Sequence, residues 1–369
     1  LPIWFLRGRG ANVIANDGQE EPGGWVDEVR SFGAQPVWGG HPPDLFADAD
    51  LVVVSPGVPH TLDFLRKAEA RRIPVIGEIE LASRFVTAPI LAVTGTNGKT
   101  TTTTLLGEML KQSGFEVFVG GNIGTPLIDC VSEKMSAERV VVEVSSFQLD
   151  TIRSFRPSVA VLLNITEDHM DRYPDFNAYV HSKGRIFENQ TEQDTAVLNG
   201  ADPHTLAAAE GIRSRKWFFN GSDSNQPGAA PAENRLHIQT PGTRVFLDLS
   251  ETPLQGDHNR ENIAAASMAA LAGGGTPEGI RTALAQFRGL PHRMAYVDTV
   301  NGVRYYNDSK GTNVDAVVRA LAAFQQPVVL IMGGRGKGGG YARLQEPVRR
   351  GVKKLIAMGE TRDAIRADL

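Results

Sequence analysis

The stretch "LAVTGTNGKTTTTTLL" (91–106) joins a short apolar run, a glycine turn and the start of a helical pattern. Backbone N–H groups of such a turn, with the positive end of the following helix, stabilise phosphate oxygens. Lys99 can reach the β- and γ-phosphates of a nucleotide, and the Thr100 hydroxyl can bind Mg²⁺. The standard spacing would place a first glycine at position 93, where this chain has Val, so an ordinary helix N-terminus remains the alternative. The stretch predicts a nucleotide-binding strand, loop and helix.

Alternating strand and helix patterns on both sides of this loop predict an α/β fold. Near-continuous apolar runs are typical of parallel strands that are covered on both faces, and here they lie at 90–94, 115–120, 139–144, 158–164 and 195–199. A polar segment at 221–250 predicts a small antiparallel annex to this sheet. Helical patterns follow at 260–272 and 277–286.

Shorter β-rich runs predict two further units, with strands at 11–16, 50–55 and 73–77 before the central sheet and at 303–307, 327–333 and 354–359 after it. We therefore expect three domains: a Rossmann-like domain at 1–86, a central ATP-binding domain at 87–287 and a second Rossmann-like domain at 288–369. The first begins with the end of a helix that stops at Gly10, where a doubly wound domain normally begins with a strand. The expectation is thus a chain truncated at both ends, with a first strand missing and an incomplete last domain.

Composition excludes several classes of protein. Of 369 residues, 41% are hydrophobic and 22% charged, and the net charge of −4 argues against a nucleic-acid-binding surface. No apolar run reaches the roughly 18 residues that a membrane-spanning helix needs. The lone cysteine, Cys130, excludes an intramolecular disulfide, which is typical of a reducing compartment and predicts a cytoplasmic protein. Its apolar surroundings favour a packing role over a nucleophilic one.

Polar groups follow four of the predicted central strands. They are Gly95–Thr100, Gly120–Gly124, Glu143–Ser146 and Thr166–His169. Because ligands bind beyond the carboxyl ends of parallel strands, their convergence predicts an active site. Glu143 is a candidate Mg²⁺ ligand, with a solvated strand end as the alternative. His169 is either a structural hydrogen-bonding residue or a ligand.

Lys183 lies on an apolar stripe at helical spacing, formed by Phe176, Tyr179, Val180, Ile186 and Phe187. A lysine at such a position either extends its amine to the surface or has a specific partner, because burial lowers the pKa of an unpaired ammonium. The second interpretation predicts a functional lysine at the active-site edge.

Four later motifs carry candidate ligand groups. They are "GDHNREN" (256–262), "LPHR" (290–293), "YYNDSKGTN" (305–313) and "GGRGKGGG" (333–340). Amides at a helix start, with His258 beside them, either grip an adenine or cap the helix. Arg293 either clamps a phosphate or lies solvated at a domain junction. Asp308 and Ser309 either cap a helix or, beside Lys310, bind a ligand. The glycine loop at 333–340 is also compatible with a surface turn.

The motifs "TGTNGKTTTT", "GGNIG", "EVSSFQL", "NITEDHMDRY", "DHNREN", "LPHR" and "NDSKGTN" occur in the order found in the ATP-dependent Mur ligases, and the chain resembles that family. The displaced glycine is the family's own form of the loop. "EVSSFQL" and "DHMDRY" are most similar to the members that add D-glutamate to UDP-N-acetylmuramoyl-L-alanine. This resemblance implies that ATP phosphorylates the substrate carboxylate, that the amine of D-glutamate attacks the acyl phosphate, and that phosphate leaves.

The resemblance also implies residue roles. Thr100 and Glu143 look like ligands of one Mg²⁺, and His169 with a carbamylated Lys183 looks like part of a second metal site. The implied ATP contacts are Gly95, Thr96, Asn97, Gly98, Lys99, Thr100, Thr101, Asn259, Asn262, Arg293 and Asp308. The implied substrate contacts are Asn122, Ser145 and His169 for muramoyl-alanine, Lys310, Thr312 and Lys337 for D-glutamate, and Asp17, Ser55, Pro56 and Gly57 for the uridine diphosphate. Lys99, His169 and Lys183 are the implied catalytic residues of a monomeric enzyme.

Some features depart from the family pattern. Gly18 and Gln19 stand where Thr-Arg is frequent, and Gly336 stands where Asp is common. The family's first strand and its closing "SPACASFD"-like segment are absent from this sequence. Other functions stay open: another amide ligase such as a folylpolyglutamate synthetase or the next Mur ligase, which "EVSSFQL" disfavours, or a nucleotide-sugar-binding module without turnover.

Overall fold

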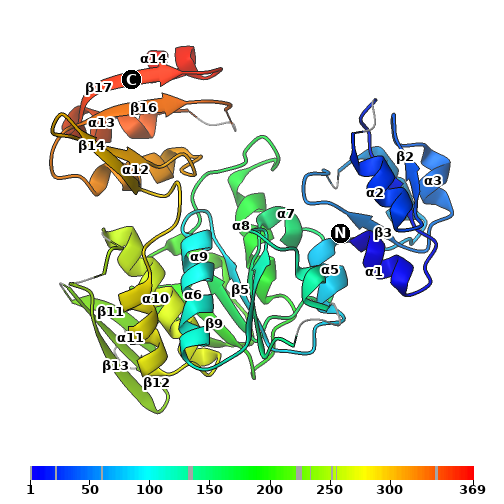
Figure 1. The fold of residues 1–369 in the computed structure, drawn as a ribbon, viewed down its shortest axis with the longest axis horizontal. Coiled ribbons are helices and arrows are strands. Elements are labelled where there is room, and N and C mark those ends of the chain that lie inside the picture. The colour runs from blue at the N-terminus through cyan, green and yellow to red at the C-terminus, as the bar shows by residue number, and fades with distance from the viewer. Residues whose placement is uncertain are drawn as a thin grey trace.

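The computed structural model describes residues 2–20, 23–59, 61–131, 136–221, 227–232, 234–250, 252–254, 256–336 and 340–369. A large central sheet carries a smaller N-terminal unit on one side and a C-terminal unit above its end (Figure 1). The α/β class with a large parallel sheet is confirmed.

Within the described residues, nine strands form one sheet in the order β13-β12-β11-β10-β9-β8-β5-β7-β6. Strands β5 to β11 pair in parallel, whereas β12 and β13 pair antiparallel, so the predicted annex is a continuation of the central sheet. The strands are β5 (Ile90–Thr94), β6 (Val117–Gly121), β7 (Arg139–Glu143), β8 (Val159–Leu162), β9 (Thr195–Asn199), β10 (Arg215–Phe219), β11 (Gly228–Ala232), β12 (Arg235–Thr240) and β13 (Thr243–Asp248).

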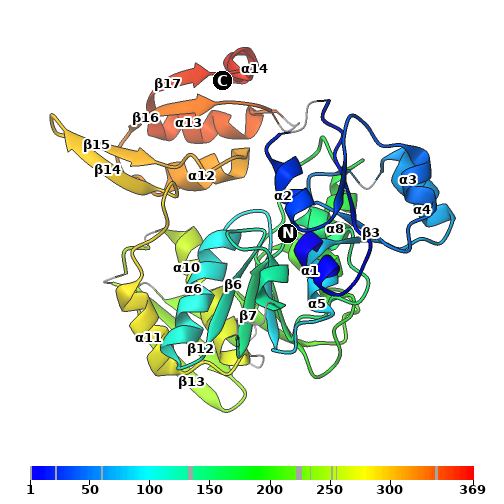
Figure 2. The ribbon, with the colours of Figure 1, turned by 45° about the vertical axis from the view of Figure 1, so that its right-hand side comes forward.

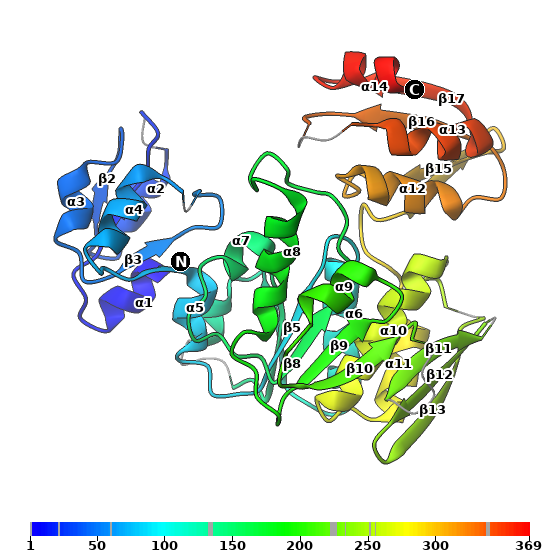
Figure 3. The ribbon, with the colours of Figure 1, turned by 180° about the vertical axis from the view of Figure 1, so that it is seen from behind.

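The helices of this central part cover both faces of the sheet (Figure 3). Several begin at a side chain that caps them, such as Asp175 before α8 and Thr276 before α11. They are α6 (Lys99–Gln112), α7 (Ser146–Leu149), α8 (Phe176–Gly184), α9 (Pro203–Ala208), α10 (Asp257–Ala272) and α11 (Pro277–Gln286), with 3₁₀ turns η1 (Leu127–Val131) and η2 (Arg185–Phe187).

The N-terminal unit contains two parallel strand pairs, β1 with β2 and β3 with β4. Its elements are α1 (Pro2–Gly8), β1 (Ile14–Asn16), α2 (Trp25–Ser31), β2 (Gln35–Val37), α3 (Pro43–Ala47), β3 (Val52–Val54), α4 (Asp63–Ala70) and β4 (Val75–Gly77), and α5 (Glu78–Ser83) leads into the central sheet.

The C-terminal unit contains an antiparallel hairpin, β14 with β15, and a parallel pair, β16 with β17 (Figure 2). Its elements are β14 (Ala295–Val300), β15 (Val303–Asn307), α12 (Val314–Ala322), β16 (Val328–Gly333), η3 (Ala342–Leu344), α13 (Gln345–Gly351), β17 (Val352–Met358) and α14 (Arg362–Asp368).

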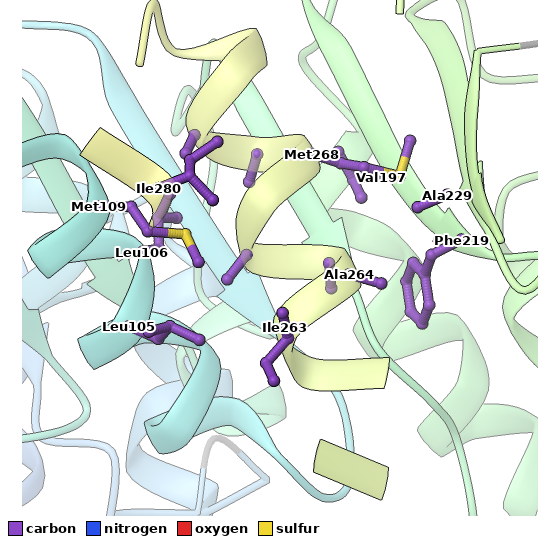
Figure 4. Close-up of a cluster of buried hydrophobic side chains, with 14 of the residues drawn as sticks. Leu105, Leu106, Met109, Val197, Phe219, Ala229, Ile263, Ala264, Met268 and Ile280 are labelled. Carbon is purple, nitrogen blue, oxygen red and sulfur yellow. The ribbon is translucent and has the colours of Figure 1, made fainter. Parts of the chain in front are cut away.

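Alternation along the central strands divides the core into two layers. Leu91 and Val93 of β5 pack in the layer that contains α6, α10 and α11 (Figure 4), whereas Ile90 and Ala92 pack in the opposite layer with α5 and α7. Both layers are apolar at residues 90–93 of β5, so the strand is packed from both sides. The polar loop that follows β5 is therefore placed at a rigid edge of the sheet.

Glu80 of α5 is a buried carboxylate that fixes the loop after α7. Its Oε2 accepts hydrogen bonds from the backbone N–H groups of Arg153, Ser154 and Phe155, each at 2.9 Å. Its Oε1 accepts from the Ser154 hydroxyl at 2.6 Å and from Arg84 Nε at 2.9 Å. Burial alone would raise the pKa of Glu80, but these donors stabilise the ionised form and hold its pKa below the usual value.

We expect Glu80→Gln to lower the free energy of unfolding at neutral pH by about 2–4 kcal/mol, because an amide cannot accept all of these hydrogen bonds. Since the folded-state pKa is lowered, the contribution is complete above the unfolded-state pKa of about 4.3 and is lost as the pH falls through the folded-state pKa. Denaturant unfolding at pH 7 and at pH 3 measures both effects.

The control is Glu278→Gln, which removes an exposed carboxylate that pairs with Arg281 at 3.1 Å. This control should change stability by less than about 1 kcal/mol. An equal effect of the two substitutions at pH 7, or a Glu80→Gln deficit that grows at pH 3, would contradict the assignment.

Candidate active site

The predicted phosphate loop connects β5 to α6 through residues 95–98. Gly95 and Gly98 have φ angles of +151° and +87°, a region that L-residues rarely adopt. A Cβ at Gly98 would lie 2.2 Å from Oδ1 of Asn262 in α10, so only glycine fits there. The loop thus brings the backbone N–H groups in the first turn of a 14-residue helix, α6, to this edge of the sheet.

Lys99 folds back over this loop. Its Nζ donates to the carbonyl oxygens of Gly95 at 3.0 Å and Thr96 at 2.8 Å. The ammonium is therefore held directly above the turn where phosphate oxygens would lie. A bound phosphate offers stronger, charged acceptors than these two carbonyls, so the same ammonium can turn to it.

Asn164, which the sequence interpretation missed, clamps the loop from the end of β8. Its Oδ1 accepts from the backbone N–H of Asn97 at 2.9 Å, and its Nδ2 donates to the Asn97 carbonyl at 3.0 Å. The Asn164 side chain is buried, and both ends of its amide are satisfied by one residue. The signal was a polar residue directly after the apolar run of β8, in the motif "NITEDH".

Glu143, at the end of β7, fits a cation. Its Oε1 accepts from Asn122 Nδ2 at 2.8 Å, whereas its buried Oε2 has no hydrogen-bond partner among the described residues. A buried carboxylate oxygen without a donor is costly unless a cation or proton satisfies it. The described residues contain no cluster of three or more His, Cys, Asp or Glu side chains that could hold a metal ion. A Mg²⁺ held by one carboxylate and nucleotide phosphates needs no such cluster.

Thr100 and Arg293 meet across the junction between the central sheet and the C-terminal unit. Arg293 Nη2 donates to the Thr100 hydroxyl oxygen at 2.7 Å. That oxygen has a second lone pair, so it can still bind a cation. Arg293 therefore lies beside the phosphate loop, as a phosphate clamp would require.

Lys183, on the apolar stripe seen in the sequence, is buried and does not extend its amine to the surface. Only 1% of the residue is exposed, and Nζ donates to the Gly95 carbonyl at 2.7 Å. It also lies 4.7 Å from the centre of the Tyr179 ring. Burial, and secondly the charge of Lys99, hold the pKa of Lys183 well below its usual value. This environment favours the neutral, nucleophilic form of its amine over the ammonium.

His169 has a φ angle of +59°, which is rare for a residue other than glycine and concentrates at functional sites. Its Nε2 lies 3.7 Å from Asp168 Oδ2, and its ring packs edge-on against Phe147 at 4.7 Å. Ser145 caps α7: its hydroxyl accepts from the Gln148 N–H and the Gln148 side chain accepts from the Ser145 N–H. The structure shows Ser145 as a helix cap, and its contact with the substrate stays a prediction.

The later motifs reach the same region from α10 and the C-terminal unit. Asn262 Nδ2 donates to Asn259 Oδ1 at 3.4 Å in the first turns of α10. Asp308 Oδ1 accepts from the Met294 N–H at 3.0 Å, and burial raises the pKa of Asp308. Lys310 lies just beyond the end of β15, and its backbone N–H donates to the His292 carbonyl at 3.1 Å.

Two groups of predicted contacts remain. Thr312 lies between Lys310 and the cap of α12, and Lys337 falls outside the described residues. In the N-terminal unit, Asp17 follows β1 and its Oδ1 accepts from the Gln19 N–H at 2.9 Å. The segment 55–57 follows β3 and faces the central part, because Arg172 Nη1 donates to the Gly57 carbonyl at 3.4 Å. The structure thus directs both outer units towards the edge that carries the phosphate loop.

Comparisons with known proteins decide the family. The family model "Mur ligase middle domain" matches residues 93–270, "Mur ligase, glutamate ligase domain" matches 292–369, and "Mur ligase MurD-like, N-terminal domain" matches 2–77. The UDP-N-acetylmuramoylalanine–D-glutamate ligase of Desulfosudis oleivorans is 54% identical over 98% of this chain and 80% of its own length. The chain belongs to the Mur ligase family. The protein of the same name from Geotalea daltonii is 47% identical to this Mur ligase over 99% of the chain and 81% of its own length.

Solved structures share the fold of this Mur ligase at lower identity. MurF from Acinetobacter baumannii superposes with a TM-score of 0.67 at 19% identity, covering 98% of this chain and 81% of that one. A pseudomurein peptide ligase type C from Methanothermus fervidus superposes with a TM-score of 0.62 at 20% identity, covering 99% and 84%. Among the described residues, no helix is long and apolar enough to cross a membrane. Mur ligases use ATP, which fits the loop geometry at residues 95–100.

Proposed function

We propose that this Mur ligase uses ATP to join D-glutamate to UDP-N-acetylmuramoyl-L-alanine in the synthesis of peptidoglycan precursors. The observation that carries the chemistry is the convergence, on one edge of the sheet, of the phosphate loop and the buried Glu143 carboxylate oxygen that lacks a donor among the described residues. The choice of substrates rests on the relatives, whose name states this reaction and whose identity to the chain reaches 54% over nearly its whole length.

The reaction needs an activated carboxylate, because an ionised carboxylate resists attack by an amine. A carboxylate oxygen of UDP-N-acetylmuramoyl-L-alanine attacks the γ-phosphorus of ATP, and the bond to ADP breaks. The neutral amine of D-glutamate then attacks the carbonyl carbon of the acyl phosphate to give a tetrahedral intermediate. The carbon–oxygen bond to phosphate breaks, the amine loses a proton, and the products are the amide, ADP and inorganic phosphate.

Lys99 and Arg293 supply positive charge along the path of phosphoryl transfer, which is what a transfer between two anions requires. Both already lie at the loop, Lys99 through the carbonyls of residues 95 and 96 and Arg293 through Thr100. We assign the remaining ATP contacts to the backbone of residues 95–101 and to Asn259, Asn262 and Asp308.

The other ligand contacts are assigned by position. Asn122, Ser145 and His169 would hold the muramoyl-alanine part, and Asp17 with residues 55–57 would hold the uridine diphosphate. Lys310, Thr312 and Lys337 would hold the carboxylates of D-glutamate. The geometry that supports this assignment is the strand-end placement of Asn122 beside Glu143 and the backbone strain at His169.

Mg²⁺ fits the donor set, and we propose two ions. Thr100 and Glu143 would hold one, and His169 with Lys183 the other. Bound there, Mg²⁺ would neutralise phosphate charge. We propose that Lys183 is carbamylated: its neutral amine adds to CO₂, a nitrogen–carbon bond forms, a proton leaves, and a carboxylate-like oxygen ligand results. The lowered pKa and complete burial of Lys183 support this modification.

We further propose three domains at 1–86, 87–287 and 288–369, and a monomer that works in the cytoplasm. The separate strand pairs of the two outer units support the division.

The test is phosphate release by the full-length protein with ATP and Mg²⁺. We expect release only when UDP-N-acetylmuramoyl-L-alanine and D-glutamate are both present, because the amine completes the turnover. Release that ignores both co-substrates would identify an ordinary nucleotide hydrolase and would overturn the proposal.

A further inference from the structure

The side chain of Asn97, in the phosphate loop, is held by the C-terminal unit. Asn97 Nδ2 donates to Asp315 Oδ2 at 2.9 Å, and Asn313 Nδ2 donates to Asn97 Oδ1 at 3.0 Å. Asn313 Nδ2 also donates to Asp168 Oδ2 at 3.2 Å, in the loop that carries His169. Two residues at the start of α12 therefore reach two separate loops of the central active-site edge.

Asp315 is itself braced by two arginines. The residue is 7% exposed, and its carboxylate accepts from Arg319 Nε at 2.8 Å and lies 3.7 Å from Arg343 Nη2. Arg319 Nη1 reaches Glu261 Oε2 of α10 at 3.2 Å. The chain of contacts thus runs from α10 through Arg319 and Asp315 to the phosphate loop.

A buried carboxylate is an unexpected neighbour for a loop that binds phosphates, because like charges repel at this range. Its charge is compensated by Arg319 and Arg343, and its acceptor oxygen is directed at the Asn97 amide rather than at the backbone N–H groups of the loop. These contacts indicate that Asp315 orients the loop and does not bind the phosphates directly.

The backbone and the side chain of Asn97 are held by different parts of the molecule. Its backbone is clamped by Asn164 from β8, whereas its side chain is gripped by Asn313 and Asp315 from α12. Docking of α12 therefore gives the loop side-chain contacts that the central sheet does not supply. If docking of α12 favours the nucleotide-binding form of the loop, then by linkage nucleotide binding must favour docking of α12 to the same extent.

We propose that Asp315 is a positioning residue, which acts through the Asn97 side chain to couple docking of the C-terminal unit to nucleotide affinity. The inference rests on the proposed use of this loop for ATP. It assigns the Asn97 side chain to the contact with α12 rather than to the phosphates. The hydrogen bond from Arg319 Nε holds the Asp315 carboxylate in place beside Asn97.

The experiment is a calorimetric titration of full-length protein with a non-hydrolysable Mg²⁺-bound ATP analogue. Asp315→Ala and Asn97→Ala should each raise the Kd by about tenfold to a hundredfold, the range for losing a charge-assisted or buried hydrogen bond. The double variant should be no weaker than the weaker single variant, because both changes remove one interaction. Asp315→Asn keeps an acceptor for Asn97 but loses the ion pair with Arg319, so its Kd should lie between those of the native protein and Asp315→Ala.

The matched control is Asp363→Ala, which removes an exposed carboxylate of α14 in the same unit, where it pairs with Arg362 at 3.0 Å. It should leave the Kd unchanged. Because Asn97 lies outside the C-terminal unit, Asn97→Ala reports on the coupling even where Asp315→Ala disturbs folding. Additive effects in the double variant, or a native Kd in Asn97→Ala, would overturn the proposal.

Nucleotide affinity is measured without amino-acid or sugar substrates, so this test is separate from that of the ligase reaction. If the proposed ligase substrates are wrong, the pattern of Kd values among the variants should still be observed. If the coupling through Asp315 is wrong, phosphate release should still depend on D-glutamate.

Discussion

Lys99→Ala should lower kcat for ligation by about a thousandfold, the scale for removing a group that stabilises charge in a transition state. The Lys99 ammonium is held over the phosphate loop by two carbonyl oxygens, where the transferring phosphoryl group would lie. Alanine leaves the loop backbone and α6 in place, so ATP binding should suffer less than turnover. Steady-state kinetics with saturating ATP separate the two effects.

The control for this substitution is Lys111→Ala, in the last turn of the same helix, where Nζ pairs with Glu108 Oε1 at 2.7 Å. Its kcat should match that of the native protein. Lys99→Ala activity within about tenfold of native would show that the loop does not act on the transferring phosphate.

Lys183→Ala should lower kcat by more than about a hundredfold, because it removes the proposed metal-site ligand together with the buried amine. Lys183 Nζ also holds the Gly95 carbonyl at 2.7 Å, so the loss extends to the phosphate loop. Formate or acetate, which supply the missing carboxylate oxygens, should restore part of the activity of Lys183→Ala.

The same carboxylates should give no rescue of Lys99→Ala, whose missing group is a cation. Bicarbonate should raise the activity of the native protein when CO₂ has been depleted, and should have no effect on Lys183→Ala. Near-native activity of Lys183→Ala would disprove both the ligand role and the carbamate.

The strands and helices with strong apolar patterns were predictable from the sequence. The predicted ranges 90–94, 195–199 and 277–286 coincide with β5, β9 and α11. The two strands are near-continuous apolar runs, and the helix has apolar residues at helical spacing after a Thr-Pro start. The strand β10 (Arg215–Phe219) was not predicted, since its run "RKWFF" begins with two cations. The union of the annex with the central sheet depends on the pairing of β10 with β11, a contact between segments that local patterns do not reveal.

In the candidate site, too, some features follow from local sequence patterns and others depend on contacts between distant segments. The helical spacing of its apolar neighbours left two outcomes open for Lys183, an amine at the surface or an amine with a specific partner. The structure shows a buried amine that donates to the Gly95 carbonyl. The partners of Asn97 lie 216 and 218 positions away in the sequence and depend on how α12 docks, so no local pattern points to them. Asp315 reads in sequence as an acidic residue in the first turn of a helix, which is common and carries no sign of a loop contact.

The most direct test of the ligase assignment counts phosphate against peptide product in the full-length protein, with D-glutamate or L-glutamate as the amine. With D-glutamate, we expect one phosphate for each amide formed. With L-glutamate, the inverted α-carbon displaces either the attacking amine or a carboxylate from its cation, and a lost charged contact typically costs about 2–5 kcal/mol. Turnover with L-glutamate should therefore be strongly suppressed. Equal use of the two enantiomers, or phosphate release without matching product, would contradict the account.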